Sequence, residues 1–145
     1  KKNFIKKNLV FTLVSSSKKN VLRGLHMQVK NPQDKFLSVL KGKVLDIAVD
    51  LRKNSKTYGK YFKIILSEKN GKHLFVPRGF AHGILGLDKD NILHYACSNY
   101  RDPKSEVSIK WNDTDLKIKW GVKKPIVSKK DRFALSLKDF ENYKR

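Results

Sequence analysis

The sequence has few of the features that mark secreted or membrane-bound proteins. It contains one cysteine, Cys97, which excludes an intrachain disulfide framework and fits a reducing compartment. No apolar run approaches the roughly 18 residues that a membrane-spanning helix needs. The first ten residues lack the continuous apolar core and the small-residue cleavage site of a signal peptide. We therefore expect a cytoplasmic protein that does not associate with membranes.

The sequence also lacks the residue spacing of a metal site. Its four histidines are His26, His73, His82 and His94. Metal-binding histidines usually stand close to one another or to acidic residues, as in H-x-H or H-E-x-x-H. None of the four has such a neighbour. We therefore expect a protein that works without a metal and without a cofactor.

Acidic residues are scarce, so the chain is strongly basic. It carries 33 lysines and arginines against 13 acidic residues, a net charge of +20. A field of this size attracts polyanions, and nucleic acid is one such class of partner. The lysines, however, are spread along the whole chain. Arginine, which most often forms the hydrogen bonds that recognise base edges, occurs only six times. We predict a lysine-rich solvent surface and no nucleic-acid partner.

Helical periodicity is nearly absent, apart from a short amphipathic stretch at 136–143. In residues 43–52, apolar side chains from Leu45 to Leu51 alternate with Asp46, Ala48, Asp50 and Arg52, which predicts a half-buried strand. Further strand candidates are 60–67, 72–77, 91–100 and 107–111, and Asn70-Gly71 predicts a hairpin between the first two of these. Many short strands without intervening helices predict one all-β domain, an antiparallel sandwich or barrel.

Two histidines stand in distinctive surroundings. Strict alternation would place Arg23 and His26 on opposite faces of a strand, so both face one cavity only if the chain bulges at Gly24. His82 lies in the sequence PRGFAHG (77–83), which predicts a glycine-punctuated turn beside a strand. A single histidine is more often a packing or surface residue than a catalytic one. The histidines alone therefore do not establish an active site.

Five stretches of the chain carry a family resemblance. They are VLRGLHMQ (21–28), QDKFLSVLKGKVLDIAVDLRKNSKTYGK (33–60), LFVPRGFAHGILGL (74–87), IKWNDTDLKIKW (109–120) and SKKD (128–131). Together, in this order, they resemble the dTDP-4-dehydrorhamnose 3,5-epimerases. The resemblance implies a cupin-type antiparallel β-sandwich or jelly roll with a short C-terminal helical tail, without the metal-binding signature of the cupins.

The resemblance also implies a reaction. A homodimer would invert C3 and C5 of a 4-keto-6-deoxyhexose attached to a nucleoside diphosphate, as in L-rhamnose biosynthesis. A hydrogen next to a ketone is weakly acidic, because the carbanion that remains is delocalised as an enolate. The protein must then supply a base of near-neutral pKa, a group that stabilises the enolate oxygen, and an acid on the opposite face of the ring.

The same resemblance implies catalytic and binding roles for individual residues. His26 matches the general base, and Asp131 matches the carboxylate that orients this histidine and stabilises its cation. Tyr95 matches the tyrosine that returns the proton, and Lys35 matches a lysine that stabilises the enolate. The positions that match substrate-binding residues are Arg23, His82, Gln28 and Arg101.

Each of these roles has a structural alternative. Tyr95 could be a strand aromatic that is half-buried by packing. Asp131 could cap a helix or turn before the C-terminal tail. Lys35 could be one solvated lysine among many, and Asp46 and Asp50 could form a solvated strand face. The joint match of several motifs favours the functional interpretation.

The chain departs from the family pattern mainly in the residues that bind the nucleotide. An N-terminal D-x-R-G-x-F motif is absent, and residues 11–15 read FTLVS where the family usually has QDNHS. Tyr100 is followed by Arg101 where the family often has two aromatics, the second stacked on the base. An acidic residue is also common at the position of Arg78. Since an arginine can also stack on a base, these changes leave the nucleotide open.

The sequence thus predicts a single cupin-like epimerase domain over residues 1–145 that lacks the N-terminal segment of the family. Its predicted partners are a nucleoside-diphosphate 4-keto-deoxysugar and a second copy of the chain. The alternatives are an epimerase that inverts a single centre of another nucleotide sugar, and a cupin that binds a nucleotide sugar without turnover. A nucleic-acid-binding β-barrel is the least favoured alternative.

Overall fold

The computed structural model describes residues 8–143 of the chain. Residues 1–7, which belong to the basic N-terminal stretch considered above, and residues 144–145 lie outside this range. The strands are β1 (Phe11–Lys18), β2 (Val21–Gln28), β3 (Lys35–Lys41), β4 (Lys43–Asp50), β5 (Tyr61–Ser67), β6 (His73–Val76), β7 (Phe80–Gly86), β8 (Asp90–Cys97), β9 (Glu106–Ser108) and β10 (Ile126–Val127). The helices are α1 (Lys129–Arg132) and α2 (Leu137–Glu141).

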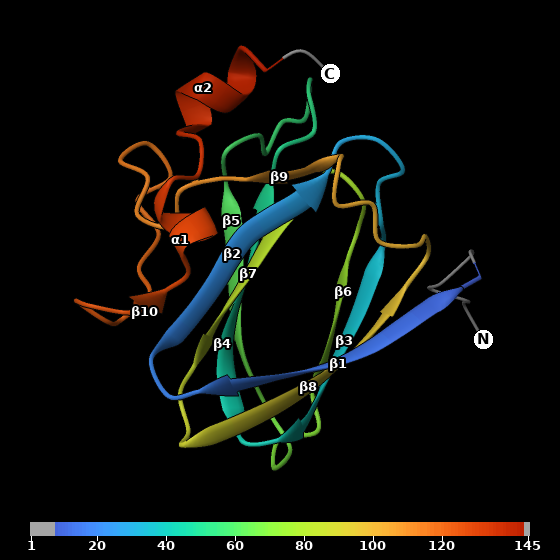
Figure 1. Cartoon of the computed structure of the whole chain (residues 1–145), viewed down its shortest axis with the longest axis vertical. Coiled ribbons are helices and arrows are strands. Elements are labelled where there is room, and N and C mark those ends of the chain that lie inside the picture. Colours follow the sequence, from blue (N-terminus) through green and yellow to red (C-terminus); the bar gives the residue numbers. More distant parts are fainter. Residues whose placement is uncertain (1–7, 144–145) are drawn as a thin grey trace.

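The strands form two sheets that face each other (Figure 1). One sheet has the order β1-β8-β3-β6, and the other has the order β10-β2-β7-β4-β5, with β9 also paired to β2. All neighbours are antiparallel except β10 and β2, which run parallel. The predicted all-β sandwich is confirmed.

The C-terminal segment covers the far side of the second sheet. Figure 1 shows this orange and red segment beside β2, on the side away from β1 and β8. Trp120, Leu137 and Phe140 pack there in one buried cluster with Ile47 and Val49 of β4. The helical tail predicted at 136–143 is confirmed as α2, whose N-terminal Ser136 and Asp139 form a capping box. No helix among residues 8–143 is long and apolar enough to cross a bilayer.

Because the second sheet is covered on both faces, β4 is not half-buried as its alternation predicted. Val44 and Ala48 pack toward the first sheet, whereas Ile47 and Val49 pack toward the C-terminal segment. Asp46 and Asp50 lie on the face expected to be solvated, yet they are 0% and 1% exposed. Their burial requires polar partners, since an unpaired carboxylate in the interior is costly.

The hairpin predicted at Asn70-Gly71 is wrong. β5, which precedes this turn, pairs with β4 in the second sheet, and β6, which follows it, pairs with β3 in the first. The turn therefore carries the chain from one sheet to the other. Its polar chemistry is that of a tight turn, with Asn70 Oδ1 accepting from the amide of Ser67, but the turn residues alone do not specify which strands pair.

Within residues 8–143, the outer face of the first sheet is exposed and carries charged side chains only at one end, where Lys18 pairs with Asp90 and Lys41 lies opposite Ile92. Register places Val14 beside His94 and Phe36 beside Phe75, on the face opposite to Leu13, Leu37 and Tyr95. Three apolar side chains are exposed along this sheet: Val14 (62%), Leu40 (55%) and Phe75 (38%). In a chain of net charge +20, a sheet face whose lysines are confined to one end is suited to contact with another protein surface. We call it the β1-β8-β3-β6 outer face.

Asp50 is held at the end of β4 by a set of short hydrogen bonds. Its carboxylate accepts from Arg52 Nε at 2.9 Å and Nη2 at 2.7 Å, and from the hydroxyls of Ser55 and Thr57, each at 2.6 Å. The hydrogen bonds from Arg52 lower the pKa of Asp50 far below its usual value, although burial opposes this shift. The carboxylate thereby fixes the loop that follows β4.

We expect Asp50→Asn to lower the free energy of unfolding by about 1–3 kcal/mol at pH 7, since a charged acceptor at the centre of this cluster is lost. A depressed folded pKa contributes stability that is complete above the unfolded pKa and is lost as pH falls through the folded pKa. The difference between wild type and variant, measured by urea unfolding, should therefore shrink below about pH 4. Asp88→Asn, at an exposed aspartate, is the control and should change stability by less than about 0.5 kcal/mol. An Asp50→Asn effect as small as the control would contradict the assignment.

Candidate active site

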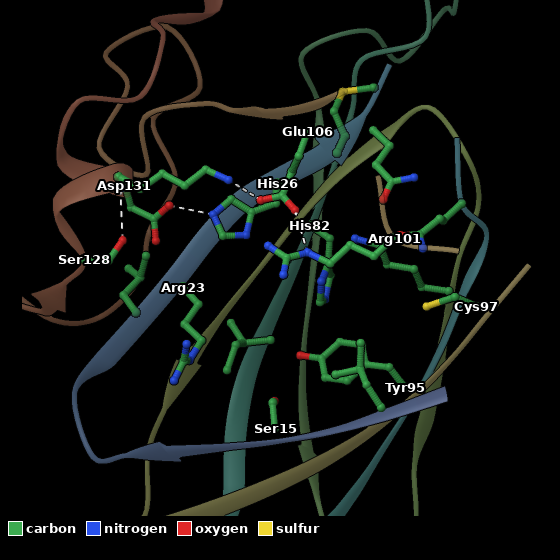
Figure 2. Close-up of a pocket in the computed structure, with 18 of the residues that line it drawn as sticks. Ser15, Arg23, His26, His82, Tyr95, Cys97, Arg101, Glu106, Ser128 and Asp131 are labelled. Carbon is green, nitrogen blue, oxygen red and sulfur yellow. Dashed lines mark hydrogen bonds and ion pairs between the residues drawn. The ribbon is translucent and has the colours of Figure 1, made fainter. Parts of the chain in front are cut away.

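A cavity of about 640 Å³ lies between the two sheets. Phe11, Leu13 and Ser15 of β1 form part of its wall, and Tyr95 and Cys97 of β8 lie beside them. The facing wall is formed by β2 and β7 and by the segment around α1. Figure 2 shows Ser15, Tyr95 and Cys97 on one side of this space and His26 and Asp131 on the other. Lys35 is the charged side chain on the wall from the first sheet, whereas Arg23, Arg101, Glu106, Lys130 and Asp131 line the cavity from the other side among apolar residues.

The bulge predicted at Gly24 is confirmed, and it brings Arg23 and His26 to the same cavity. The register between β2 and β7 shifts between these two residues, and both line the cavity. Gly24 has φ +113°, and a Cβ placed there would lie 2.6 Å from the carbonyl oxygen of His82. Only glycine meets both conditions without strain.

His26 and Asp131 form a hydrogen-bonded pair on the β2 side of the cavity. His26 Nε2 lies 2.5 Å from Asp131 Oδ1, and Asp131 Oδ2 accepts from the amide of Gly24 at 3.3 Å. Ser128, not Asp131, caps α1 by accepting from the Asp131 amide. Burial alone would raise the pKa of Asp131, but its hydrogen bonds with His26, Gly24 and Ser128 hold it below the usual value. An ionised Asp131 is placed to stabilise a protonated His26.

His82 forms a second histidine–carboxylate pair in the same cavity. It lies within β7, not in a turn as predicted, because the glycines that flank it are accommodated in the strand. Its Nε2 lies 2.8 Å from Asp46 Oδ1, and the two side chains are 6% and 0% exposed. Asp46 Oδ2 is buried without a hydrogen-bond partner among the described residues. Asp46, expected on a solvated face, is instead the residue that orients His82.

Tyr95 reaches the cavity from the opposite sheet. Its ring meets that of His82 edge-on, with the centroids 6.1 Å apart, and its hydroxyl points into the cavity (Figure 2). Burial and the charge of Asp46 raise the pKa of Tyr95 well above its usual value, although Ser15 and Arg23 act in the other direction. The phenol therefore stays protonated at neutral pH. It can act as a proton donor but not as the resting base.

Arg23 and Lys35 bring basic side chains to the cavity in different ways. Arg23 is tied to β1, donating from Nε to the Ser17 hydroxyl at 2.9 Å and from Nη2 to the Ser16 carbonyl at 3.1 Å. Lys35 lines the cavity from β3, and burial lowers the pKa of its amine. The amine is thus not one more solvated lysine, since its side chain faces the enclosed space.

Gln28 and Arg101 lie at the mouth of the cavity. The Gln28 amide is fully engaged with backbone: it donates to the carbonyls of Asn31 and Tyr100 and accepts from the amide of Asp102. We therefore assign Gln28 to holding the loop that carries Arg101. Arg101 Nε donates to Glu106 at 3.3 Å, and its side chain extends over the cavity (Figure 2).

Sequence reasoning missed Glu106 and Lys130. Glu106 binds Arg101 with one oxygen and the ammonium of Lys130 with the other, so a carboxylate is held between two cations at the rim. Burial tends to raise the pKa of Glu106, but Lys130, His26 and Arg101 lower it overall. Both residues line the cavity with His26. No local motif marks them, because they come from separate segments that meet only in the fold.

These features define the class of the protein: a cupin-type β-sandwich with a histidine–aspartate pair and a tyrosine on opposite walls of one cavity. Among residues 8–143, no group of three or more histidine, cysteine, aspartate or glutamate side chains is arranged to hold a metal ion. The family model described as dTDP-4-dehydrorhamnose 3,5-epimerase matches residues 1–139, and the chain belongs to this family.

Individual relatives agree with this assignment. The chain is 44% identical over 121 residues to dTDP-4-dehydrorhamnose 3,5-epimerase from Methanothermobacter thermautotrophicus, covering 81% of the chain and 65% of the relative. It is 45% identical over 122 residues to the enzyme of that name from Salmonella typhimurium, covering 83% and 67%. The chain thus spans about two thirds of these relatives.

A solved structure extends the likeness to three dimensions. The dTDP-6-deoxy-D-glucose-3,5-epimerase from Legionella pneumophila, solved in complex with dTDP-4-keto-L-rhamnose, is 41% identical and superposes with a TM-score of 0.90. The match covers 92% of this chain and 72% of that one. The resemblance to the family and the cupin-type fold are confirmed.

Proposed function

We propose that this chain catalyses the inversion of C3 and C5 in a nucleoside-diphosphate 4-keto-6-deoxyhexose, converting dTDP-4-dehydro-6-deoxyglucose to dTDP-4-dehydrorhamnose. One observation carries the proposal: His26 of β2, hydrogen-bonded to Asp131 of α1, and the protonated Tyr95 of β8 lie on opposite walls of one cavity. A sugar ring bound between the sheets would have the base on one face and the acid on the other. Removal of a proton by one and its return by the other inverts the carbon.

In this mechanism His26 removes the hydrogen next to the ketone, and Asp131 stabilises the imidazolium that forms. Negative charge then develops on the ketone oxygen as the enolate. Lys35 and His82, the latter held by Asp46, line the cavity near Tyr95 and would stabilise that oxygen. Tyr95 delivers a proton to the opposite face of the carbon. Repetition at the second carbon needs no new group, since both carbons flank the same ketone.

The rim suits the diphosphate of a nucleotide sugar. Arg23, Arg101 and Lys130 place three cationic side chains around the cavity, and guanidinium groups bind phosphate oxygens well. Two alternative functions that the sequence left open, inversion of a single carbon and binding without turnover, would use the same cavity. They are distinguished by the configuration of the product.

The experiment is to incubate the protein with dTDP-4-keto-6-deoxyglucose, reduce all ketones with borohydride, and identify the sugars after hydrolysis. Double inversion yields L-rhamnose and 6-deoxy-L-talose. Inversion at C3 alone yields 6-deoxy-D-allose and 6-deoxy-D-gulose, which would replace the proposal with a single-centre epimerase. Recovery of only 6-deoxy-D-glucose and 6-deoxy-D-galactose, from a protein that binds the nucleotide sugar, would favour the binding protein.

We also infer that the active form is a homodimer assembled through the β1-β8-β3-β6 outer face. That face carries Val14, Leu40 and Phe75 in exposed positions and no lysine in its centre. Two chains of +20 charge repel one another least where their contact is centred on uncharged side chains. Burial of the apolar side chains supplies the favourable free energy of association.

The double variant Val14→Lys/Leu40→Lys should be monomeric at concentrations where the wild type is a dimer. Each like-charge contact costs several kcal/mol, so the dissociation constant should rise roughly 100-fold or more. Sedimentation velocity over a concentration series measures this change. Ile65→Lys, at an exposed residue of β5 in the other sheet, is the matched control and should leave the dimer intact. A dimer that survives the double change would place the interface elsewhere.

A further inference from the structure

An amine and a thiol stand next to each other in the wall of the cavity. Lys35 on β3 is paired directly with Cys97 on β8, and both line the cavity. Residues in direct register leave an antiparallel pair on the same face, with Cβ atoms about 4.5–5.5 Å apart. Cys97 is the only cysteine of the chain and is 2% exposed. The pair therefore combines two nucleophiles in one enclosed place.

Lys35 and Cys97 are both available for reaction in the described part of the chain. Among residues 8–143, the Lys35 ammonium has no hydrogen bond or ion pair with a carboxylate. Burial lowers the pKa of the Lys35 amine, although the charges of Cys97, Glu106 and Asp46 oppose this. Burial likewise raises the pKa of the Cys97 thiol. Both shifts favour the neutral form, and the neutral form of an amine is the one that attacks a carbonyl.

We propose that Lys35 and Cys97 form a binding site for aldehydes, with a preference for aldehydes that carry an anionic group. The Lys35 nitrogen bonds to the carbonyl carbon, and the carbonyl oxygen leaves as water with the two amine hydrogens, which yields an imine. The Cys97 sulfur then bonds to the imine carbon while the thiol proton passes to the nitrogen. The adduct is a thioaminal that bridges β3 and β8, and its formation requires no oxidant or reductant.

The preference for an anionic group follows from the charges around the pair. Arg23, Arg101 and Lys130 line the same cavity. Arg101 and Lys130 share the single carboxylate of Glu106, and Asp131 is paired with His26. Arg23 donates to the uncharged oxygens of Ser16 and Ser17, so the cations outnumber the carboxylates. A phosphate on the aldehyde would therefore find unneutralised positive charge a short way from the amine. Since the adduct lies inside the cavity, such aldehydes should also act as reversible inhibitors of any activity located there.

The pair is tested with o-phthalaldehyde, which joins an adjacent amine and thiol into a fluorescent isoindole with loss of two water molecules. We expect isoindole fluorescence from the wild type, and a loss of at least tenfold in both Lys35→Arg and Cys97→Ser. Lys63→Arg, at an exposed lysine of β5, is the matched control and should retain the signal. Thermal melting of each variant confirms that it is folded. Equal fluorescence in Lys35→Arg, or none in the wild type, would overturn the pairing.

The anion preference is tested with pyridoxal 5′-phosphate and pyridoxal, each trapped by borohydride and mapped by peptide mass spectrometry. The phosphate compound should label Lys35 at least tenfold faster, and inorganic pyrophosphate should slow that labelling. Equal rates with the two aldehydes would overturn the anion preference, and labelling spread evenly over surface lysines would overturn the site. No nucleotide sugar is used, so this result is independent of whether the chain proves to be an epimerase.

Discussion

Replacement of His26 by asparagine should reduce the rate of proton exchange at C3 and C5 of the 4-keto sugar by roughly 10³-fold or more. Asparagine keeps a polar side chain near Asp131 but cannot accept and hold a proton near neutral pH. General acid–base catalysis by a positioned side chain typically contributes about 10²–10⁴-fold. Because one histidine serves both carbons in the proposed mechanism, exchange should be lost at C3 and C5 together.

The measurement is the rate of deuterium uptake from heavy water, followed by mass spectrometry. Asp131→Asn should cause a smaller loss, since His26 remains but the charge that stabilises its cation is removed. His73→Asn is the control, because His73 is an exposed residue of β6 outside the cavity; since it shares the outer face with Phe75, sedimentation velocity verifies that this variant assembles as the wild type does. Retention of exchange at either carbon in His26→Asn would mean that a second base serves that carbon, and His82 with Asp46 would be the first candidate.

Replacement of Tyr95 by phenylalanine should separate proton exchange from inversion. Without the phenol, His26 can still remove the proton, exchange it with solvent and return it to the same face. We therefore expect deuterium to enter the substrate while the formation of inverted product falls roughly 10²–10⁴-fold. The cavity should keep its shape, since the ring contact with His82 does not depend on the hydroxyl.

Two readouts make this prediction specific to a proton donor. Product configuration, measured after borohydride reduction, reports inversion, and mass spectrometry of the recovered substrate reports exchange. Because burial and Asp46 raise the pKa of Tyr95, the wild-type activity should not decline near pH 10 through ionisation of this phenol. Phe80→Leu, at a partly buried aromatic of β7 outside the cavity, is the control for lost aromatic packing. Unchanged inversion in Tyr95→Phe would assign the acid to another group.

Much of the fold could be read from local pattern. Alternating β-branched and aromatic residues predicted β4, β5, β6, β8 and β9, and the amphipathic tail predicted α2. The bulge at Gly24 followed from a conflict between strict alternation and a shared cavity for Arg23 and His26. These features depend on a few neighbouring residues, and local chemistry is sufficient to specify them.

The predictions that were wrong concern features that depend on tertiary packing. Alternation along β4 correctly sorted its residues into two faces, but it could not show that both faces would be covered, the apolar one by the C-terminal segment and the one with Asp46 by the first sheet. Asp46 and Asp50 were therefore assigned to solvent, although they are buried with His82 and Arg52 as partners. The turn at Asn70-Gly71 was likewise recognised as a turn, but strand pairing is a tertiary property that it does not determine.

Some residues of the site could be named from the sequence, whereas the pairings between them could not. His26, Tyr95, Lys35 and Asp131 were named through the family resemblance, and the structure brings all four to one cavity. The pairings of Asp46 with His82 and of Glu106 with Arg101 and Lys130 join segments far apart in the chain. Neither pairing has a spacing that sequence reasoning could detect.

The most direct test of the central claim is mass spectrometry and proton NMR of dTDP-4-keto-6-deoxyglucose incubated with the protein in heavy water. A base and an acid on opposite walls of the cavity predict two deuterons in the product, one at C3 and one at C5, with both carbons inverted. A nucleotide sugar that binds in the cavity, yet is recovered without deuterium at either carbon, would contradict the account.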